Sequence, residues 1–431
     1  MRRADRAETL TACRSQVAGD TGLTISGEVA CGLQQNIIYR ETFSSRMSSG
    51  MTFLSVEQLD GQVSSTSGIA IDFARDWRHV ASRLSTGHRT AFQHVYWLDA
   101  WYEAFRDVSP LIAVIFDVAT GKDIAIVPMI SHIRRGIRIV EFADLGVSDN
   151  NAPILALDAA LDAETTDAIS DALIDALRAL PDRFDLLRLR KMPAQVGGKP
   201  NPLVSLGRIG SSSLNGNLVL MGDDYRDYQA AIKRLQMPRC WRVFSRHAGA
   251  RFEIATDVGR AHELLDVMDA QQQARMQKLG SPFVLNDETH ARFYREVVRQ
   301  GVAEGYAIVS ALVCDEGVVA TALGVKHGAT YILLRISHAS DAWSSCSPGL
   351  LVTERTMAAL HVQGIRRFDL SIGNQDYKRR FGAEKVPLTD VSVALSWRGL
   401  PYAWRDHAAQ GLRRYPRLAA LTARAMGKGI R

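Results

Sequence analysis

Two spacings of apolar and polar positions recur along the first half of the chain, and each predicts a different element. Residues 71–84 and 95–105 carry apolar side chains at helical spacing, which predicts two helices. The apolar runs LIAVIFDV and IAIVPMISHI, separated by GKD, predict a pair of buried strands. Residues 157–180 predict a helix that Pro181 ends. With the strand-like segments IRIVEFADL and FDLLRLRKM, this pattern predicts one α/β unit over about residues 70–200.

A similar order of elements follows in the second half. RFEIAT predicts a strand, and residues 257–279 and 287–303 predict helices. Three strands are expected from GYAIVSALVCD, GVVATALGVKHG and TYILLRIS. A helix over 348–363, the strand IRRFDLSI, the short helix NQDYKRRF and the strand VSVALSW come next. The fold class predicted is therefore α/β, with two similar units in tandem, each a mixed, mainly antiparallel sheet flanked by helices.

The boundaries of these units follow from changes in composition. The segment VGGKPNPLVSLGRIGSSSLNGN is rich in Gly, Ser, Asn and Pro and predicts a loop that joins the two halves. We expect an N-terminal domain over 53–205 and a C-terminal domain over 215–397. Residues 1–52 lack sustained periodicity and predict a poorly ordered leader. Residues 398–431 predict a basic helical tail with eight Lys or Arg and one acidic residue.

Charge and composition narrow the class of protein. The net charge of +6 favours a polyanionic ligand or surface. No run approaches the roughly 20 apolar residues of a membrane-spanning helix, and the N-terminus has no signal-peptide core. We therefore expect a cytoplasmic protein, whose basic tail either forms a surface helix or contacts an anionic membrane face. The five cysteines form no CxxC pair or zinc-ligand spacing, so we expect reduced thiols and no metal.

The segment with the most chemical information begins at the predicted helix 348–363. Ser347 is a good N-cap residue, and Pro348 at the first helical position costs no hydrogen bond. A helix start presents free N–H groups and partial positive charge, which suit a phosphate. Gly349 permits close approach to the backbone. The alternative is a well-capped helix with no ligand.

The strand IRRFDLSI and the short helix after it add candidate catalytic groups. Ligands in α/β sheets gather at the carboxyl ends of strands. Asp369 lies within this strand, where a carboxylate is costly unless it is paired or functional. Tyr377 and Lys378 lie one turn into the next helix, above the same edge. The alternatives are a structural ion pair for Asp369 and a packing role for Tyr377.

Several motifs keep a common order between Ile71 and Arg398: AFQHVYWLDAW, IAIVPM, GVSDNNAPIL, RCWRVFSRHAG, SPGLLV and DLSIGNQDYKRRFG. This arrangement resembles the CelD-like acyltransferases of bacterial cellulose and exopolysaccharide gene clusters, which belong to the GNAT superfamily. These enzymes look similar to the Fem-type peptidoglycan aminoacyltransferases. The resemblance implies an N-acyltransferase that moves an acyl group from acyl-CoA to an amine in exopolysaccharide or cell-envelope biosynthesis.

The resemblance also implies a donor site in the second half. The CoA pyrophosphate would bind at the start of helix 348–363, although the segment departs from the usual Q/R-x-x-G-x-G/A loop. The pantetheine arm would lie between strands 330–337 and 366–372, which splay apart. The residues implied to contact the cofactor are Ser347, Pro348, Gly349, Leu350, Arg335, Ile336, Asn374 and Lys378.

The implied reaction is direct attack of an amine on the thioester, which requires positioning, an oxyanion donor and a base. A backbone N–H near Arg335–Ser337 would be the oxyanion donor, and Tyr377 would protonate the departing thiolate. The base would be Asp369 or His338, although a lone loop histidine is often only solvated. Acyl transfer through a covalent intermediate on Cys346 is an alternative. The sequence shows no His and Asp pair that would activate this thiol.

The acceptor would be a small-molecule, sugar-linked or lipid-linked amine. Arg275, Trp97 and Asp149 are the candidate substrate-binding residues. Trp97 is alternatively a core residue at i, i+4 spacing with Trp101, and Asp149 is alternatively part of a turn.

Two other functions remain open at this point. The basic segment Lys233, Arg234, Arg239, Arg242 and Arg246 is either a solvated face or a phosphate contact. If the segment contacts phosphates, an aminoacyl-tRNA donor remains possible. No other nucleic-acid partner is expected. A non-catalytic GNAT-fold assembly factor for polysaccharide production is the third hypothesis.

Overall fold

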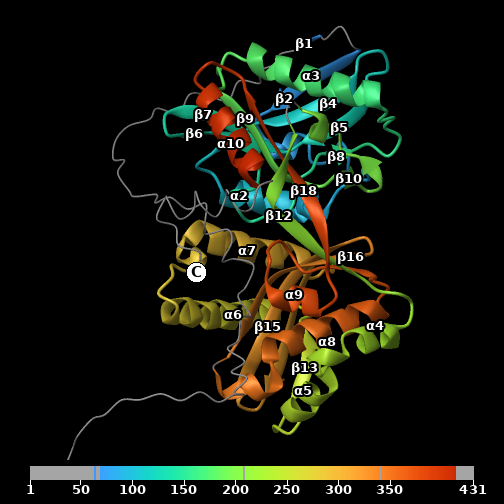
Figure 1. The fold of residues 1–431 in the computed structure, drawn as a ribbon, viewed down its shortest axis with the longest axis vertical. Coiled ribbons are helices and arrows are strands. Elements are labelled where there is room, and N and C mark those ends of the chain that lie inside the picture. Colours follow the sequence, from blue (N-terminus) through green and yellow to red (C-terminus); the bar gives the residue numbers. More distant parts are fainter. Residues whose placement is uncertain (1–62, 65–67, 207–208, 340, 414–431) are drawn as a thin grey trace, which may run out of the picture.

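The computed structural model describes residues 63–64, 68–206, 209–339 and 341–413, with the N-terminal half drawn above the C-terminal half in Figure 1. The predicted leader 1–52 and the end of the tail, 414–431, lie outside the described residues. Each half is a mixed α/β unit.

The first half follows the predicted strand meander, with two helices flanking it. The main elements are β2 (Ile69–Ala74), α2 (Val95–Ala104), β4 (Ile112–Asp117), β5 (Asp123–Val127), β6 (Met129–Arg134), β7 (Ile137–Phe142), α3 (Ala163–Ala179) and β9 (Leu186–Met192). Short pieces complete it: β1 (Val63–Ser64), η2 (Trp77–His79), η3 (Ala91–Gln93), β3 (Ser109–Pro110), β8 (Ile154–Leu155), β10 (Gln195–Val196), β11 (Lys199–Pro200) and η4 (Pro202–Ser205).

The second half matches its predicted elements closely. They are β12 (Ile209–Leu220), α4 (Tyr225–Ala231), η5 (Lys233–Leu235), α5 (Met237–Phe244), β13 (Arg251–Ile254), α6 (Val258–Lys278), η6 (Val284–Asn286), α7 (Glu288–Gly301), β14 (Ala307–Cys314), β15 (Gly317–His327), β16 (Thr330–His338), η7 (Asp341–Cys346), α8 (Pro348–Val362), β17 (Arg367–Asp369), α9 (Asp376–Arg380), β18 (Glu384–Ala394) and α10 (Leu400–Arg413).

Both halves contain one parallel strand pair at the same place in their element order. In the first half β7 pairs with β9, and in the second β16 pairs with β17. A helix, α3 or α8, connects the two strands of each pair, as parallel pairing requires. The remaining pairings within each half are antiparallel. The predicted tandem α/β architecture with mainly antiparallel mixed sheets is confirmed.

The two halves join by exchanging their last strands. The large sheet has the order β13-β14-β15-β16-β17-β12-β18-β9-β7-β6-β3. β12 follows the first half in sequence but lies between β17 and β18, and β18 follows the second half but lies between β12 and β9. One continuous sheet therefore runs through the junction (Figure 1).

The loop predicted over 196–217 was wrong from Ile209 onward, where β12 begins. The residues of β12 up to Asn217 are mostly Ser, Asn and Gly, and such residues are depleted in strands. β18 pairs with residues 209–211 and 215–218 of this strand, so pairing with a distant strand overrides the local composition.

The helix predicted over 71–84 was also wrong. Ile69, Ile71 and Phe73 are buried on alternate positions of β2, which pairs antiparallel with β4. Trp77 then begins the short helix η2. Phe73 belongs to β2 and Trp77 to η2, so their four-residue spacing resembled that of a helix although they lie in two different elements.

The two halves also share a hydrophobic core between α2 and α7. Trp97 of α2 packs edge-on against Phe293 of α7, with ring centroids 4.8 Å apart. Tyr306 Oη donates to the carbonyl oxygen of Ala91 at 2.8 Å. Burial of such aromatic side chains contributes roughly 1.5–3 kcal/mol each, so this contact fixes the halves relative to one another.

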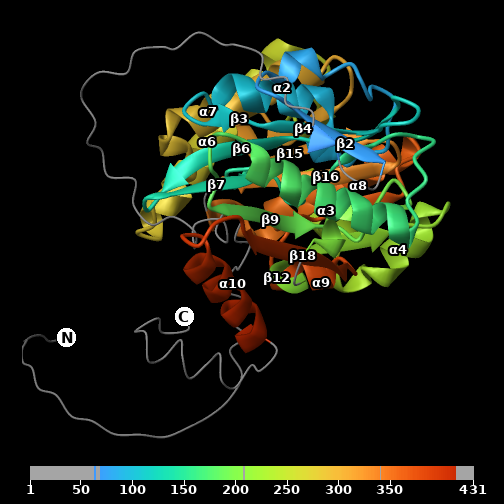
Figure 2. The ribbon, with the colours of Figure 1, turned by 90° about the horizontal axis from the view of Figure 1, so that it is seen from above.

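The predicted tail helix is present as α10, which projects from the sheet beside β9 and β18 (Figure 2). Asp406 on its inner face accepts from Arg188 Nε at 2.8 Å and from Ser392 Oγ at 2.9 Å. Within the described ranges, no helix combines the length and apolar character that crossing a membrane requires.

Candidate functional site

The parallel strands β16 and β17 diverge soon after they meet. Their ladder has three residue pairs and ends at Ile332 opposite Asp369. Beyond this point β16 continues to His338 paired with β15, whereas Leu370 N donates to Asn217 O at 2.8 Å. The predicted splay between these strands is confirmed.

A β-bulge lies in β16 just beyond the point of divergence. Leu323 of β15 faces Arg335 and Gly324 faces Leu333, so Leu334 is the extra residue. A bulge leaves its extra residue outside the ladder and redirects the backbone. A Cβ at Gly324 would lie 2.4 Å from Ile332 O, so the close approach of the strands here requires glycine. The bulge places unpaired backbone close to the predicted oxyanion donor at Arg335–Ser337.

The Arg335 side chain points away from this gap into the scaffold. It is 1% exposed, and its Nη2 contacts Asp269 Oδ1 at 2.5 Å and Gln272 Oε1 at 2.6 Å. Its guanidinium lies over the ring of Tyr294, 5.1 Å from the centroid. These contacts tie α6 and α7 to β16, and they leave only the backbone of Arg335 for a cofactor.

The start of α8 lacks the predicted side-chain cap. Ser347 occupies the N-cap position, but its φ of 46° is left-handed and its hydroxyl makes no capping bond. That conformation turns the hydroxyl away from the first-turn N–H groups, which a β-region N-cap would face. Pro348, Gly349 and Leu350 are buried, and both η7 and α5 contact α8.

The equivalent helix start in the first half carries negative charge instead. Asp162 caps α3 and accepts from Thr165 N at 2.8 Å, and Glu164 lies in the first turn. The first turn of α8 has no acidic residue. Of these two helices, α8 alone therefore keeps its first-turn N–H groups free of a carboxylate.

Cys346 ends η7 directly before α8. Its thiol donates to Trp343 O at 3.2 Å, and burial raises its pKa to about 11. A thiol that stays protonated at neutral pH is a poor nucleophile, which disfavours the acyl-cysteine alternative.

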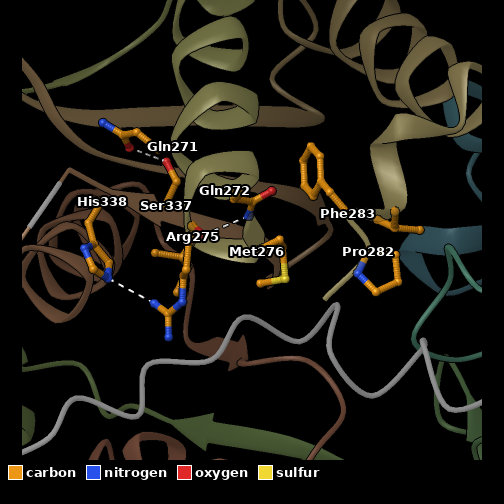
Figure 3. Close-up of a pocket in the computed structure, with 10 residues that line it drawn as sticks. Gln271, Gln272, Arg275, Met276, Pro282, Phe283, Ser337 and His338 are labelled. Atoms are coloured by element: carbon orange, nitrogen blue, oxygen red, sulfur yellow. Dashed lines mark hydrogen bonds between the residues drawn. The ribbon is translucent and has the colours of Figure 1, made fainter. Parts of the chain in front are cut away.

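A small pocket at the far end of β16 brings Arg275 and His338 together (Figure 3). Arg275 Nη1 donates to His338 Nε2 at 3.1 Å, and His338 Nδ1 donates to Ala339 O at 2.9 Å. Both ring nitrogens are thus engaged in hydrogen bonds. Pro282 and Phe283 of the α6–α7 connection close the other side. A candidate acceptor residue and a candidate base from the sequence share this pocket.

A larger cleft of about 980 Å³ lies between the two halves. Asp149 and Asn150 line it from the first half, and Ile332 and Asp369 line it from the second. Since Ile332 and Asp369 form the last pair of the β16–β17 ladder, the cleft reaches the point where these strands diverge.

Ser371 links the two carboxyl groups in this cleft. Its hydroxyl donates to Asp149 Oδ2 at 2.6 Å, and its backbone N–H donates to Asp369 Oδ1 at 2.8 Å. Ser371 has a φ of 71°, a left-handed conformation that non-glycine residues seldom adopt. Asp149 is 7% exposed, and its Oδ1 accepts no hydrogen bond from any described residue.

Burial and, to a smaller extent, the neighbouring charge of Asp369 raise the pKa of Asp149 to about 7, against the lowering effect of the Ser371 hydrogen bond and of Lys191 and Lys378. Burial likewise raises the pKa of Asp369. A carboxyl group that titrates near neutral pH is suited to proton transfer. The structure therefore joins the predicted substrate residue Asp149 to the predicted base Asp369, and leaves His338 in the other pocket.

The residues of α9 support this arrangement without lining either pocket. Lys378 Nζ donates to Ser371 O at 3.2 Å and Ile372 O at 2.7 Å, so it holds the segment that carries Ser371. Tyr377 is 4% exposed within the hydrophobic core, and Asn374 is exposed. Their predicted cofactor and catalytic roles stay predictions.

Trp97 has no exposed surface in this structure. Its indole N–H donates to Ser148 Oγ at 3.1 Å, and its ring packs on Phe92 and Phe293. Trp97 is therefore a core residue, and it does not reach a substrate. Its contact with Ser148 lies next to Asp149 in the sequence.

The other end of the large cleft contains residues that the sequence did not single out. His94 stacks on Tyr306 with ring centroids 4.5 Å apart, and burial lowers its pKa to about 4. His327 and Arg89 also line this end. Arg89 and His94 lie on either side of η3, whereas His327 ends β15, and nothing in the local sequence signals that these segments meet.

Comparison with known proteins finds one family model that matches part of the second half. Residues 233–379 match the family model described as Acetyltransferase (GNAT) domain. This GNAT segment includes β16, α8, β17 and most of α9.

Solved structures with a similar arrangement are distant in sequence. The chain is similar to the crystal structure of FemX, with 9% identity, 77% of this chain and 96% of that chain covered, and a TM-score of 0.48. It is similar to a tandem GNAT protein from the clavulanic acid biosynthesis pathway at 11% identity, with 76% and 99% covered and a TM-score of 0.41. L-PGS from Bacillus licheniformis is similar at 13% identity, with 73% and 91% covered and a TM-score of 0.43. No curated protein matches.

Proposed function

We propose that the chain is an N-acyltransferase that moves an acyl group from acyl-CoA to an amine. The observation that carries this proposal is the divergence of β16 from β17, with a bulge at Leu334, inside the GNAT segment. The gap is suited to an extended pantetheine arm, because both strand edges offer backbone groups to an amide chain. The backbone at the bulge would stabilise the oxyanion.

The donor's phosphates are proposed to rest at the start of α8. Its first turn has neither a side-chain cap nor an acidic residue, which suits an anion. Pro348–Leu350 are buried beneath η7 and α5, so η7 has to shift when a phosphate binds. The pairing of Trp343 with His247, ring centroids 4.4 Å apart, is the contact that such a shift would break.

The acceptor amine is proposed to enter through the cleft between the halves. Asp149 would take the proton from the ammonium group, and the freed nitrogen lone pair would attack the thioester carbon. The C–N bond forms, the C–S bond breaks, and the nitrogen releases its second proton as the amide forms. The CoA thiolate leaves and takes up one proton, for which Tyr377 is the proposed donor and is reprotonated by the proton that the nitrogen releases. Asp149 suits the role of base better than His338, because both ring nitrogens of His338 are engaged.

Acetyl-CoA is expected to bind the wild-type chain, as measured by titration calorimetry. Ser347→Asp places a carboxylate at the start of α8, as Asp162 does in α3, and aspartate tolerates a left-handed conformation. We expect this variant to bind acetyl-CoA at least about tenfold more weakly, because a carboxylate repels the phosphates.

The matched control is Asp162→Ser, which removes the carboxylate at the start of α3 in the first half but keeps a side chain that can cap the helix. It should leave acetyl-CoA affinity unchanged. Equal affinity in Ser347→Asp and wild type, or no binding heat at all, would remove the proposed donor site.

A role in exopolysaccharide or cell-envelope biosynthesis, with a sugar-linked or lipid-linked amine as acceptor, is proposed on the motif resemblance. Mass spectrometry of the products formed from acetyl-CoA and candidate amino sugars tests it. Acylation of the amine supports the proposal, and no acylation of any amino sugar contradicts it.

One observation favours an aminoacyl-tRNA donor as a second candidate. Lys233, Arg234, Arg239, Arg242 and Arg246 are all exposed on η5, α5 and the turn after it. Such a cationic face predicts tRNA binding that weakens steeply with salt. A gel shift at low salt with no retardation of tRNA would remove this candidate.

A further inference from the structure

The start of α10 presents an exposed aromatic face. Trp397 and Trp404 are 79% and 77% exposed, and Leu400 is 59% exposed. Leu400 and Trp404 are four residues apart on one helix face, and Trp397 lies just before the helix. The opposite face of α10 packs inward through Ala403 and Asp406.

The turn between β6 and β7 extends this face. Tyr402 Oη donates to Arg135 O at 3.4 Å, and the Arg398 guanidinium donates to Gly136 O, so the turn lies against α10. Ile133 adds an apolar side chain that is 67% exposed. We name this surface, formed by Ile133, Arg135, Trp397, Arg398, Leu400, Trp404 and Arg405, the α10 face.

The charges of the α10 face are positive. Arg135, Arg398 and Arg405 are exposed on it, and the nearest acidic residue of the helix, Asp406, binds Arg188 on the inner side and also pairs with Arg405 at 3.1 Å. The sequence that follows, 414–431, has five Lys or Arg and no Asp or Glu. A second copy of this face would meet it with like charge, which opposes self-association.

We propose that the α10 face docks on an anionic lipid surface. Exposed tryptophans beside arginines match the membrane interface, where indole rings lie at the headgroup level and cations meet lipid phosphates. α10 projects from the body of the molecule (Figure 2). The docking requires no acyl transfer and stands apart from the proposed function.

The test is co-sedimentation of the full chain with vesicles of phosphatidylcholine alone or of phosphatidylcholine with phosphatidylglycerol. Wild type is expected to bind only the anionic vesicles, more weakly as salt rises. Trp397→Ser with Trp404→Ser should lower the binding constant by at least about tenfold, because it removes the apolar anchors. Arg405→Glu should lower it by about fivefold or more, the contribution of one surface cation.

Two control variants keep the test specific. Val362→Ser changes a side chain that is 88% exposed at the end of α8, and Arg251→Glu reverses an exposed charge on β13. Both should bind the anionic vesicles like wild type.

Three results would overturn the proposal. They are no binding to anionic vesicles, binding that the two tryptophan substitutions leave unchanged, and a wild-type dimer that those substitutions convert to monomer without any vesicle binding. Light scattering of wild type and variant separates the last of these from lipid docking.

Discussion

Replacing Asp149 with asparagine is expected to lower kcat by about 10²- to 10⁴-fold, the usual contribution of a general base. The structural reason is that the Asp149 carboxyl lies in the cleft, with Oδ2 held by Ser371 and Oδ1 without a hydrogen bond from the described residues. Asparagine keeps the shape and the contact with Ser371 but cannot accept a proton. Steady-state acyl transfer to an amine measures the effect.

The pH dependence gives a second measurement of the same residue. Because the base must be deprotonated and the pKa of Asp149 is about 7, wild-type kcat/KM should rise with pH through about 7 and level off above it. The asparagine variant should lack this inflection. Asp158→Asn, an exposed substitution in the same half, should retain the wild-type profile.

Stability separates a catalytic role of Asp149 from a structural one. Its pKa is raised from about 4 in the unfolded chain to about 7 in the folded protein, so the folded state binds more protons in this window. The free energy of unfolding therefore falls as pH rises from about 4 to 7. Asp149→Asn removes this loss and should unfold at an equal or higher temperature than wild type above pH 7. A less stable variant at that pH would contradict the assignment.

The second large effect is expected at Arg335. Replacing it with alanine should lower the free energy of unfolding by about 3–5 kcal/mol, because it empties the buried site of the Arg335 side chain and removes its contacts with Gln272, which is buried, and with Asp269, which is 19% exposed. Urea unfolding monitored by circular dichroism measures the change. Arg295→Ala is the matched control: Arg295 contacts the same Asp269 at 3.6 Å, but its side chain is 41% exposed, and the expected change is about 1 kcal/mol or less.

A double substitution tests the physical reason. Arg335→Met with Asp269→Leu removes both charges together and should recover the part of the lost stability that comes from the unpaired charge, while Gln272 Oε1 still lacks the hydrogen bonds from Arg335. If the double variant is as unstable as Arg335→Ala, the loss comes from packing with Tyr294 rather than from the unpaired charge.

The elements that the sequence predicted well are those with strong local signals. The apolar runs of β14, β15 and β16 are almost wholly buried, so their composition alone marks them as strands. Pro348 marks the start of α8 and Gly364, with a φ of 90°, marks its end. The divergence of β16 from β17 was predicted from the family resemblance, and the register confirms it.

What the sequence could not predict depends on contacts between distant segments. β12 is polar up to Asn217 and forms a strand there because it pairs with β18, a strand far along the chain. Asp149 and Ser371 are 222 positions apart, so their hydrogen bond has no local signal. Arg335 was expected near the cofactor because of its place on β16, whereas the bulge at Leu334 turns its side chain toward α6.

Hydrogen–deuterium exchange of the full chain with and without acetyl-CoA tests the central claim, that the gap beside β16 holds the acyl donor. Slower exchange is predicted in peptides covering Leu333–His338 and Ser347–Thr353. The equivalent parts of the first half, β7, β9 and the start of α3, should not change. Protection confined to the first half, or no protection in either half at saturating acetyl-CoA, would contradict the account.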